Sequence, residues 1–131
     1  MDDKTPFMTR KKYERIALGK WGEALAADYL VDKGYTLLTT NFRTPDGEID
    51  LVVQKDTELV FVEVKTRRNL KYGNPEEAVN DEKLDHLESA AGYFLLLHPE
   101  YENNWRLDVI TVIGSPAEKK PQIDWFENVN G

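Results

Sequence analysis

The sequence contains no cysteine and only two histidines, His86 and His98. The lack of cysteine excludes disulfide scaffolds, thiolate catalysis and zinc sites built on Cys ligands. With so few histidines, a metal site made of several His ligands is not expected either. The absence of cysteine also agrees with a protein of the reducing cytoplasm.

Long hydrophobic segments are missing as well. No apolar run approaches the roughly 20 residues that a membrane-spanning helix needs, and residues 1–10 contain no apolar stretch typical of a signal peptide. We therefore expect a cytoplasmic protein that does not enter the membrane. The 131 residues, 40% hydrophobic and 31% charged, are typical of one globular domain. We expect a flexible tail over residues 1–11 and a single domain over residues 12–131.

Charge is distributed unevenly along the chain. The net charge of −7 argues against a protein that clamps DNA through a positive surface on every side. Residues 1–73 contain 13 Lys and Arg against 12 Asp and Glu, whereas residues 74–131 contain 4 against 12. A polyanion is therefore expected to approach the first part of the chain. The acidic second part is a solvated or repellent face, or a surface that docks on a basic protein.

Hydrophobic periodicity predicts two helices and four or five strands. Apolar residues at helical spacing run from Leu18 to Leu30 and form a second stripe within residues 84–95. One sheet with a helix on each side is the simplest arrangement of these elements, so we expect an α/β fold. The expected helices cover residues 12–33 and 80–98, and the expected strands cover residues 35–43, 48–54, 59–66, 105–113 and 122–126.

Two of the expected strands differ in the placement of their apolar residues. In the strand over residues 48–54, Ile49, Leu51 and Val53 alternate with other residues and are expected on one face. Residues 59–66 are apolar on both faces, which is typical of a strand in the middle of its sheet. We therefore place residues 59–66 at the centre of the sheet.

The connection between these two strands predicts a specific pairing. Either a two-residue or a four-residue loop gives the same register, in which Asp50 lies opposite Glu63. Opposed residues of an antiparallel pair share a face, with Cβ atoms about 4.5–5.5 Å apart. Lys65, two residues further on, shares that face. The sequence thus predicts two carboxylates and one ammonium group close together.

Two interpretations of this group remain open. Two facing carboxylates repel each other unless a cation joins them, and hard oxygen ligands suit Mg²⁺ or Mn²⁺, which activate water for phosphodiester hydrolysis. The alternative is a surface ladder of ion pairs on a hairpin. Glu63 and Lys65 interrupt an apolar run, where charge is costly, and this favours a functional site.

A third carboxylate, Glu23, lies at the edge of the apolar stripe of the first helix, so its head is expected near the edge of the sheet. Gly19 and Gly22 precede it and permit close approach of a backbone or a ligand. From periodicity alone, an ordinary glutamate at the boundary of the helix remains the simpler interpretation.

Several motifs together resemble a known family. They are GKWGEALAADYLVDKGY, NFR, GEIDLVV and FVEVKTR, in this order. They resemble the YraN family of bacterial proteins, which is placed in the PD-(D/E)xK nuclease superfamily and is similar in core layout to archaeal Holliday-junction resolvases. The resemblance runs from about residue 15 to residue 113. It implies a restriction-endonuclease-like core, with a mixed central β-sheet flanked by α-helices.

The resemblance also implies roles for individual residues. Asp50 and Glu63 match the metal-binding acidic residues of the motif, and Lys65 matches its catalytic lysine. Glu23 matches the helical glutamate that completes the metal site in resolvase-like members. The implied cofactor is Mg²⁺ or Mn²⁺, and the implied reaction is hydrolysis of DNA phosphodiester bonds.

Basic residues near this group are expected to bind the substrate. Lys83 matches a basic residue of related sequences and is expected to contact phosphate. The loop after residue 66 contains Arg67, Arg68 and Lys71, and we expect it to face the substrate rather than to be merely solvated. Glu48 belongs to a matching motif and either supports Asp50 or faces solvent.

These observations predict a metal-dependent endonuclease that acts on DNA, with selectivity for DNA structure as one form that its activity could take. The alternative is a binding or adaptor module that retains the fold without catalysis. Resolvase-like relatives pair, so a homodimer is a candidate assembly. Among the aromatic residues, Trp21 and Trp105 are expected in the core, whereas Trp125 is open to either core packing or base stacking.

Overall fold

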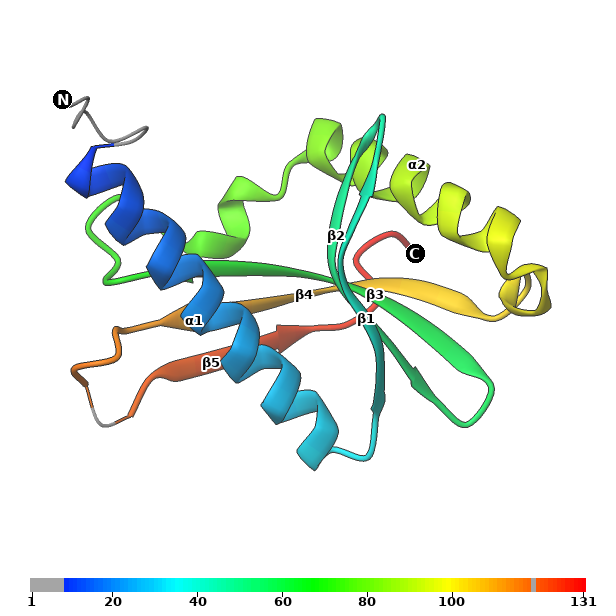
Figure 1. The fold of residues 1–131 in the computed structure, drawn as a ribbon, viewed down its shortest axis with the longest axis horizontal. Helices are drawn as coiled ribbons and strands as arrows, with labels where there is room; N and C mark the ends of the chain where they lie inside the picture. The colour runs from blue at the N-terminus through cyan, green and yellow to red at the C-terminus, as the bar shows by residue number, and fades with distance from the viewer. Residues whose placement is uncertain (1–8, 119) are drawn as a thin grey trace, which may run out of the picture.

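The computed structural model describes residues 9–118 and 120–131. Within them, one five-stranded sheet lies between two long helices (Figure 1). This is the α/β arrangement expected of a restriction-endonuclease-like core. The elements are α1 (Arg10–Asp32), β1 (Thr36–Thr44), β2 (Gly47–Lys55), β3 (Glu58–Arg67), α2 (Asp81–Leu97), β4 (Trp105–Ile113) and β5 (Gln122–Phe126), with short 3-10 helices at Pro75–Ala78 and Pro99–Tyr101.

Local side-chain and backbone groups determine where the helices begin and end. Helix α1 begins at Arg10, two residues earlier than expected, because the hydroxyl of Thr9 accepts a hydrogen bond from the backbone N–H of Lys12 at 3.2 Å. Gly34, with φ +98°, follows the end of α1. The expected tail therefore does not include residues 10 and 11, and its residues 1–8 lie outside the described part of the chain.

The sheet is mixed, with the strand order β1-β2-β3-β4-β5. Strands β1, β2 and β3 are antiparallel neighbours, β3 and β4 are parallel, and β5 is antiparallel to β4. Helix α2 lies between β3 and β4 in sequence, so it forms the crossover that a parallel pair requires. Strand β3 occupies the centre of the sheet, and this confirms the expectation drawn from its two apolar faces.

Each face of the sheet has its own hydrophobic cluster. On one face, Leu30 of α1 packs with Leu51, Val62 and other residues of the sheet. On the opposite face, Phe94 of α2 packs with Phe61 and its neighbours. Helices α1 and α2 thus cover the two faces that residues 59–66 present, as Figure 1 shows.

Strand β2 does not keep its apolar residues on one face, and the expectation for Ile49 is therefore wrong. Leu51 and Val53 belong to the cluster under α1, whereas Ile49 belongs to the cluster under α2. The partner strand explains the change. Asn41, which lies between the partners of Leu51 and Ile49, has φ 50°, a left-handed conformation that interrupts the regular alternation of β1.

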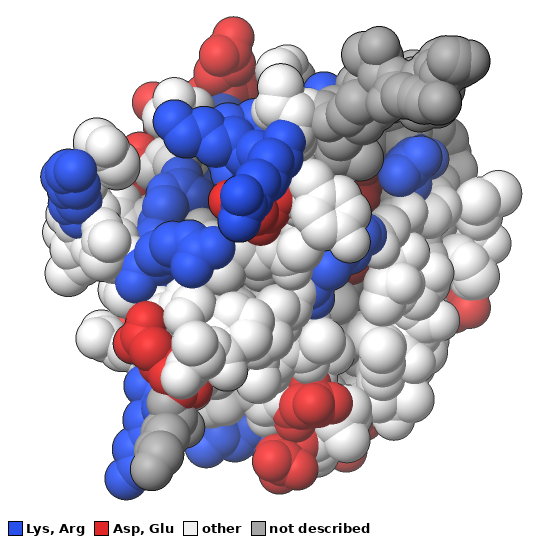
Figure 2. Space-filling model, turned by 60° about the vertical axis from the view of Figure 1, so that its left-hand side comes forward, with Lys and Arg blue, Asp and Glu red and all other residues white. Residues whose placement is uncertain are grey.

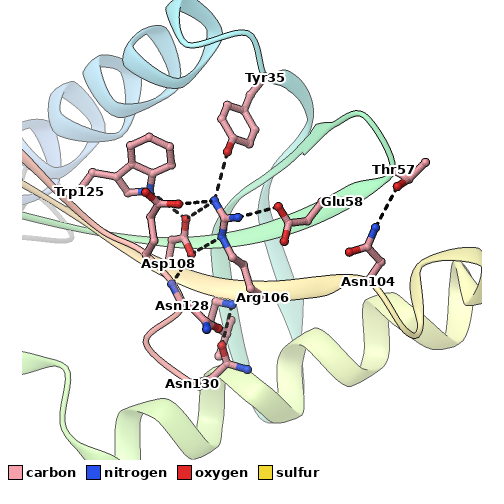
Figure 3. A network of polar contacts seen from close by, with 11 residues as sticks. Tyr35, Thr57, Glu58, Asn104, Arg106, Asp108, Trp125, Asn128 and Asn130 are labelled. Atoms are coloured by element: carbon pink, nitrogen blue, oxygen red, sulfur yellow. Dashed lines mark hydrogen bonds and ion pairs between the residues drawn. The ribbon is translucent and has the colours of Figure 1, made fainter.

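A polar network lies at the end of the sheet where β3 and β4 begin (Figure 3). At its centre, Asp108 is 1% exposed and accepts hydrogen bonds from two nitrogens of Arg106, at 2.9 and 3.2 Å. Asp108 also accepts from Nε1 of Trp125 and from the backbone N–H of Asn128, both at 2.9 Å. The network therefore attaches β5 and the segment after it to the sheet. Trp125 thus has a structural role.

No helix in the described ranges, 9–118 and 120–131, has both the length and the apolar character needed to cross a bilayer.

Candidate functional site

The candidate site forms where strands β2 and β3 separate. The β2–β3 ladder follows the expected register from the pair Lys55–Glu58 to the pair Leu51–Val62. Strand β3 continues beyond this point. There the backbone N–H of Val64 donates to the Oδ2 atom of Asp50 at 2.8 Å instead of to a carbonyl of β2. The side chain of Asp50 thus takes the place of a backbone carbonyl at the fork between the two strands.

Asp50 lies in surroundings that disfavour its charged form. Burial, followed by repulsion from Glu63, raises the pKa of Asp50 to about 8. The charge of Glu23 acts in the same direction, whereas the hydrogen bond from Val64 opposes the shift. The ladder ends before it reaches Asp50 and Glu63, so they are not a ladder pair as expected, but their carboxyl groups still interact. Near neutral pH the pair retains a proton.

Glu63 is buried, and two ammonium groups reach its carboxylate. Nζ of Lys65, from the same strand, and Nζ of Lys83, from α2, each lie 3.3 Å from Oε2 of Glu63. Lys83, expected to contact phosphate, is directed to Glu63 in this structure. The α2 helix thus contributes directly to the charge balance of the site.

Glu23 approaches the fork from α1 and is held by an asparagine. Nδ2 of Asn41 donates to Oε1 of Glu23 at 3.2 Å and to Oε2 of Glu48 at 2.9 Å. The Oδ1 atom of Asn41 accepts from Lys20 at 3.2 Å, and the Lys20 ammonium lies 3.7 Å from Glu23. Glu48 therefore takes part in the support of the site rather than facing only solvent.

A cavity of about 710 Å³ opens beside Lys65, between α1 and the loop that follows β3. Cationic residues dominate its charged lining, with Glu23 as the one carboxylate among the lining residues of the described chain. Figure 2 shows that Lys and Arg side chains gather over part of this end of the molecule. The cationic lining residues are Arg15, Lys65, Arg67, Arg68 and Lys71.

The cavity brings together most of the residues expected to bind substrate. Arg67, Arg68 and Lys71 lie around it together with Lys65. Lys83 is not among its lining residues. A locally positive cavity in a chain of net charge −7 concentrates the electrostatic attraction for a polyanion at one place.

The donor set at the fork suits a hard cation. Asp50 and Glu63 offer carboxylate oxygens, and a divalent ion between them would remove the repulsion that raises the Asp50 pKa. Within residues 9–118 and 120–131, however, no group of three or more His, Cys, Asp or Glu side chains is arranged to hold a metal. Glu23, expected as a third metal ligand, therefore does not form such a group with Asp50 and Glu63. The fit is to an ion with two protein carboxylates and further ligands from water or substrate, which Mg²⁺ commonly retains.

Three residues of the site were not among those expected from the sequence. Asn41 connects two carboxylates, Arg15 lines the cavity, and Tyr72, also in the lining, is 89% exposed. Only Asn41 had a visible signal, because it begins the NFR motif. Arg15 and Tyr72 could not be found from periodicity, since their place depends on how α1 and the loop after β3 meet.

Comparison with known proteins identifies the family. Residues 22–112 match the family described as "Uncharacterised protein family UPF0102". The chain belongs to this family. The expected resemblance to the YraN family is thereby confirmed.

Members of the UPF0102 family from distant bacteria are similar over most of their length. A protein of Syntrophomonas wolfei is 47% identical over 103 residues, which cover 79% of this chain and 90% of the relative. A protein of Dehalococcoides mccartyi is 40% identical over 119 residues, covering 91% of this chain and 97% of the relative. A third, from Thermodesulfovibrio yellowstonii, is 48% identical over 99 residues, covering 75% and 87%. Their names state no activity, so the function has to be argued from the site.

Proposed function

We propose that this UPF0102 protein is a metal-dependent nuclease that hydrolyses DNA phosphodiester bonds at the fork between β2 and β3. The observation that carries the proposal is the pair of the partly buried Asp50 and the buried Glu63 next to Lys65 and a cationic cavity. Strongly shifted pKa values beside a cavity are typical of functional sites. The position of Asp50 next to a second carboxylate disfavours its charged form, and a fold that needed only stability would gain nothing from this arrangement.

Asp50 and Glu63 are the residues that would hold Mg²⁺ or Mn²⁺. Such an ion, when bound, supplies Lewis-acid activation of water and of a phosphate oxygen. Because the pKa of Asp50 is raised to about 8, the carboxyl group has to lose its proton before it serves as a ligand. The charge of Glu23 acts on Asp50, and Asn41 holds the Glu23 carboxylate in position.

Lys65 supplies positive charge at the reacting phosphate. Its ammonium lies against Glu63 and at the same time lines the cavity, so it faces both the acidic pair and the space for substrate. In that place it orients the attacking water or stabilises the negative charge that develops on the phosphate oxygens. Arg67, Arg68 and Lys71 hold neighbouring phosphates along the loop.

One observation favours a second candidate function. Glu63 has two ammonium partners, Lys65 and Lys83, so its charge is balanced by the chain itself. A protein in which these ion pairs persist would bind nucleic acid in the cavity without cleaving it. The second candidate is therefore a nucleic-acid-binding or adaptor module with the nuclease fold.

Cleavage of a panel of labelled DNAs tests the first candidate. Single-stranded, duplex, flap and four-way-junction DNA are incubated with Mn²⁺ or Mg²⁺ and the wild-type chain, or with Asp50→Asn or Lys65→Met. We expect metal-dependent cleavage that is lost in Asp50→Asn. In Lys65→Met we expect it to fall by about 10²–10³-fold, as when a group that stabilises transition-state charge is removed.

Matched variants control for the chemical change itself. Asp56→Asn alters an exposed turn residue at the far end of the same hairpin, and Lys33→Met alters an exposed residue after α1. Both are expected to cleave as the wild type does. Absence of cleavage by folded wild type, together with binding of the same DNAs, would replace the nuclease by the binding module. Equal cleavage by wild type and Asp50→Asn would remove the site from the proposal.

A further inference from the structure

We infer that the cavity beside Lys65 accepts a nucleotide whose base is unpaired, and that the base stacks on the ring of Tyr72. The inference rests on the proposed nucleic-acid function and names the substrate class of the same site: single-stranded or locally unpaired DNA. Three features support this inference: an exposed aromatic ring, the positive charge around that ring, and an open wall in the same cavity.

Tyr72 is the most exposed large hydrophobic residue of the described chain, at 89%. The three tryptophans, which are the stronger stacking residues, are all partly buried and pack against the two cores. Tyr72 instead projects from the loop after β3, and Nζ of Lys71 lies 5.5 Å from its ring centroid. The exposed ring offers a flat surface that is suited to stacking with a base.

The surroundings of Tyr72 match the rest of a nucleotide. The same cavity is lined by Arg67, Arg68 and Lys71, whose charges suit phosphates on either side of the stacked base. Its volume of about 710 Å³ lies in the range of pockets that hold small organic ligands, about 300–1,000 Å³. The combination of aromatic ring and cations is that of single-strand binding sites.

The wall formed by α1 leaves room for the nucleotide. Gly19 and Gly22 lie one turn apart on this helix but serve different purposes. A Cβ atom at Gly22 would lie 1.9 Å from the hydroxyl oxygen of Thr66, so Gly22 permits the packing of α1 on β3. A Cβ atom at Gly19 would meet nothing within 4 Å, and Gly19 lines the cavity. The absence of a side chain at Gly19 therefore enlarges the cavity, whereas the packing of α1 on the sheet does not require it.

The base has to be unpaired for a geometric reason. In an intact duplex each base lies between its neighbours, so an outside ring has no free base face on which to stack. A single strand, a flap or an extruded nucleotide offers such a face. Stacking alone is tolerant of sequence, because every base has a flat face. The inferred selectivity is therefore for DNA structure and not for base sequence.

Binding is measured by fluorescence anisotropy in EDTA, so that no cleavage occurs. The probes are a labelled oligothymidylate, a strand of the same length in which every base is replaced by an abasic tetrahydrofuran unit, and a duplex. The abasic strand carries the same phosphates and lacks the bases. We expect the full-length wild-type chain to prefer the oligothymidylate over the abasic strand by about 5- to 100-fold.

Variants of the ring test the stacking directly. Tyr72→Leu is expected to remove most of the preference for the base-containing strand and to leave binding of the abasic strand unchanged. Tyr72→Phe keeps the ring and is expected to retain the preference. Tyr93→Leu changes another exposed tyrosine, on α2 and outside the cavity lining, and is expected to behave as the wild type does.

A second pair of variants tests the cavity without touching the loop. Gly19→Leu fills the open wall, and because leucine is a better helix former than glycine, we expect no loss of stability. Its affinity for oligothymidylate is expected to fall at least several-fold. Gly92→Leu is the matched control, since Gly92 is also helical, with nothing within 4 Å of its added Cβ, and lies on α2.

The outcomes separate this inference from the proposed nuclease activity. An unchanged base preference in Tyr72→Leu, or no binding of any strand by the folded protein, overturns the inference. DNA cleavage that depends on Asp50, combined with binding insensitive to Tyr72, overturns the inference and leaves the nuclease. Base-dependent binding through Tyr72 without cleavage in Mn²⁺ or Mg²⁺ supports the inference and overturns the nuclease.

Discussion

Asp50 and Asp108 are carboxylates of the same sheet, one partly buried and the other fully buried, and their surroundings are opposite. Asp108 accepts four hydrogen bonds from three residues, including two from the guanidinium of Arg106. Among the described residues, the backbone N–H of Val64 donates to Asp50, and the Asp50 carboxyl group also forms a side-chain hydrogen bond with its neighbour Glu63. The fold compensates the charge of Asp108, whereas it disfavours the charged form of Asp50.

The partner of Asp108 shows the same compensation. Burial alone would lower the pKa of Arg106, but its hydrogen bonds and the charges of Asp108 and Glu58 raise it above the ordinary value. At the fork, burial and Glu63 both raise the pKa of Asp50, so the two effects add. The contrast indicates which carboxylate stabilises the fold and which is available for a ligand.

The largest expected effect in this comparison is that of Asp108→Asn. The substitution keeps the size of the side chain but removes the most deeply buried of the three carboxylates that pair with Arg106, the others being Glu58 and Glu127. We expect the free energy of unfolding to fall by about 3–5 kcal/mol, as when one member of a buried ion pair is removed. Urea denaturation followed by tryptophan fluorescence measures this change.

Asp56→Asn provides the control for the Asp108 variant, because the same chemical change then occurs on an exposed turn. It is expected to alter the free energy of unfolding by less than about 0.5 kcal/mol. A loss of stability in Asp108→Asn no larger than in this control would show that the network of Figure 3 contributes little to the fold.

Asp50→Asn is expected to change stability in the opposite direction, by raising the free energy of unfolding. The folded-state pKa of about 8 lies above the ordinary value of 3.8, so between these values the folded protein keeps a proton that the unfolded chain releases. The stability contributed by Asp50 is therefore fully present below the lower pKa and is lost as the pH rises toward the higher one. The amide cannot ionise, so the variant avoids this loss.

The measurement compares urea denaturation of wild type and Asp50→Asn in EDTA at several pH values. We expect the variant to be more stable by about 1–3 kcal/mol near pH 8, with the difference shrinking as the pH falls toward 5. A wild-type stability that rises over this interval relative to the variant would contradict the assignment. It would mean that the folded state favours the charged form of Asp50.

The smallest expected effect on stability is that of Lys83→Met. The Lys83 side chain is about one-third exposed, so its ion pair with Glu63 is screened, and we expect a change below about 1 kcal/mol. Affinity for Mn²⁺, measured by isothermal titration calorimetry, is instead expected to rise several-fold. The reason is that the ammonium no longer competes with the cation for Glu63.

Lys33→Met serves as the control in this titration, because Lys33 is exposed and follows the far end of α1. It is expected to bind Mn²⁺ as the wild type does. Weaker Mn²⁺ binding in Lys83→Met would show that Lys83 supports the acidic pair in the bound state rather than opposing the ion.

The local parts of the fold were accessible from sequence because short-range chemistry determines them. Helical spacing of apolar residues predicted both helices, and the two apolar faces of residues 59–66 predicted the central position of β3. The short loop between β2 and β3 predicted their register, because few residues are available to close a hairpin. From that register followed the proximity of Asp50 and Glu63, on which the proposed site depends.

Other features followed only from the way distant segments meet. The left-handed conformation of Asn41 moved Ile49 to the face opposite Leu51, which no alternating pattern shows. The ion pair of Lys83 with Glu63 requires a particular position of α2 along β3. The exposure of Tyr72 likewise follows from the path of the loop after β3, which has no periodicity from which to predict it.

The sequence by itself determined which residues form strands and helices, which strand is central, and which two acidic residues come close at the end of one hairpin ladder. These properties depend on side-chain periodicity and on a loop of a few residues, both of which are local. Only the tertiary structure decided that the charge of Asp108 is compensated and that of Asp50 is not. That difference depends on donors that Arg106, Trp125 and Asn128 bring to Asp108, and on the termination of the β2–β3 ladder beside Asp50. Both arise from packing between segments far apart in the chain.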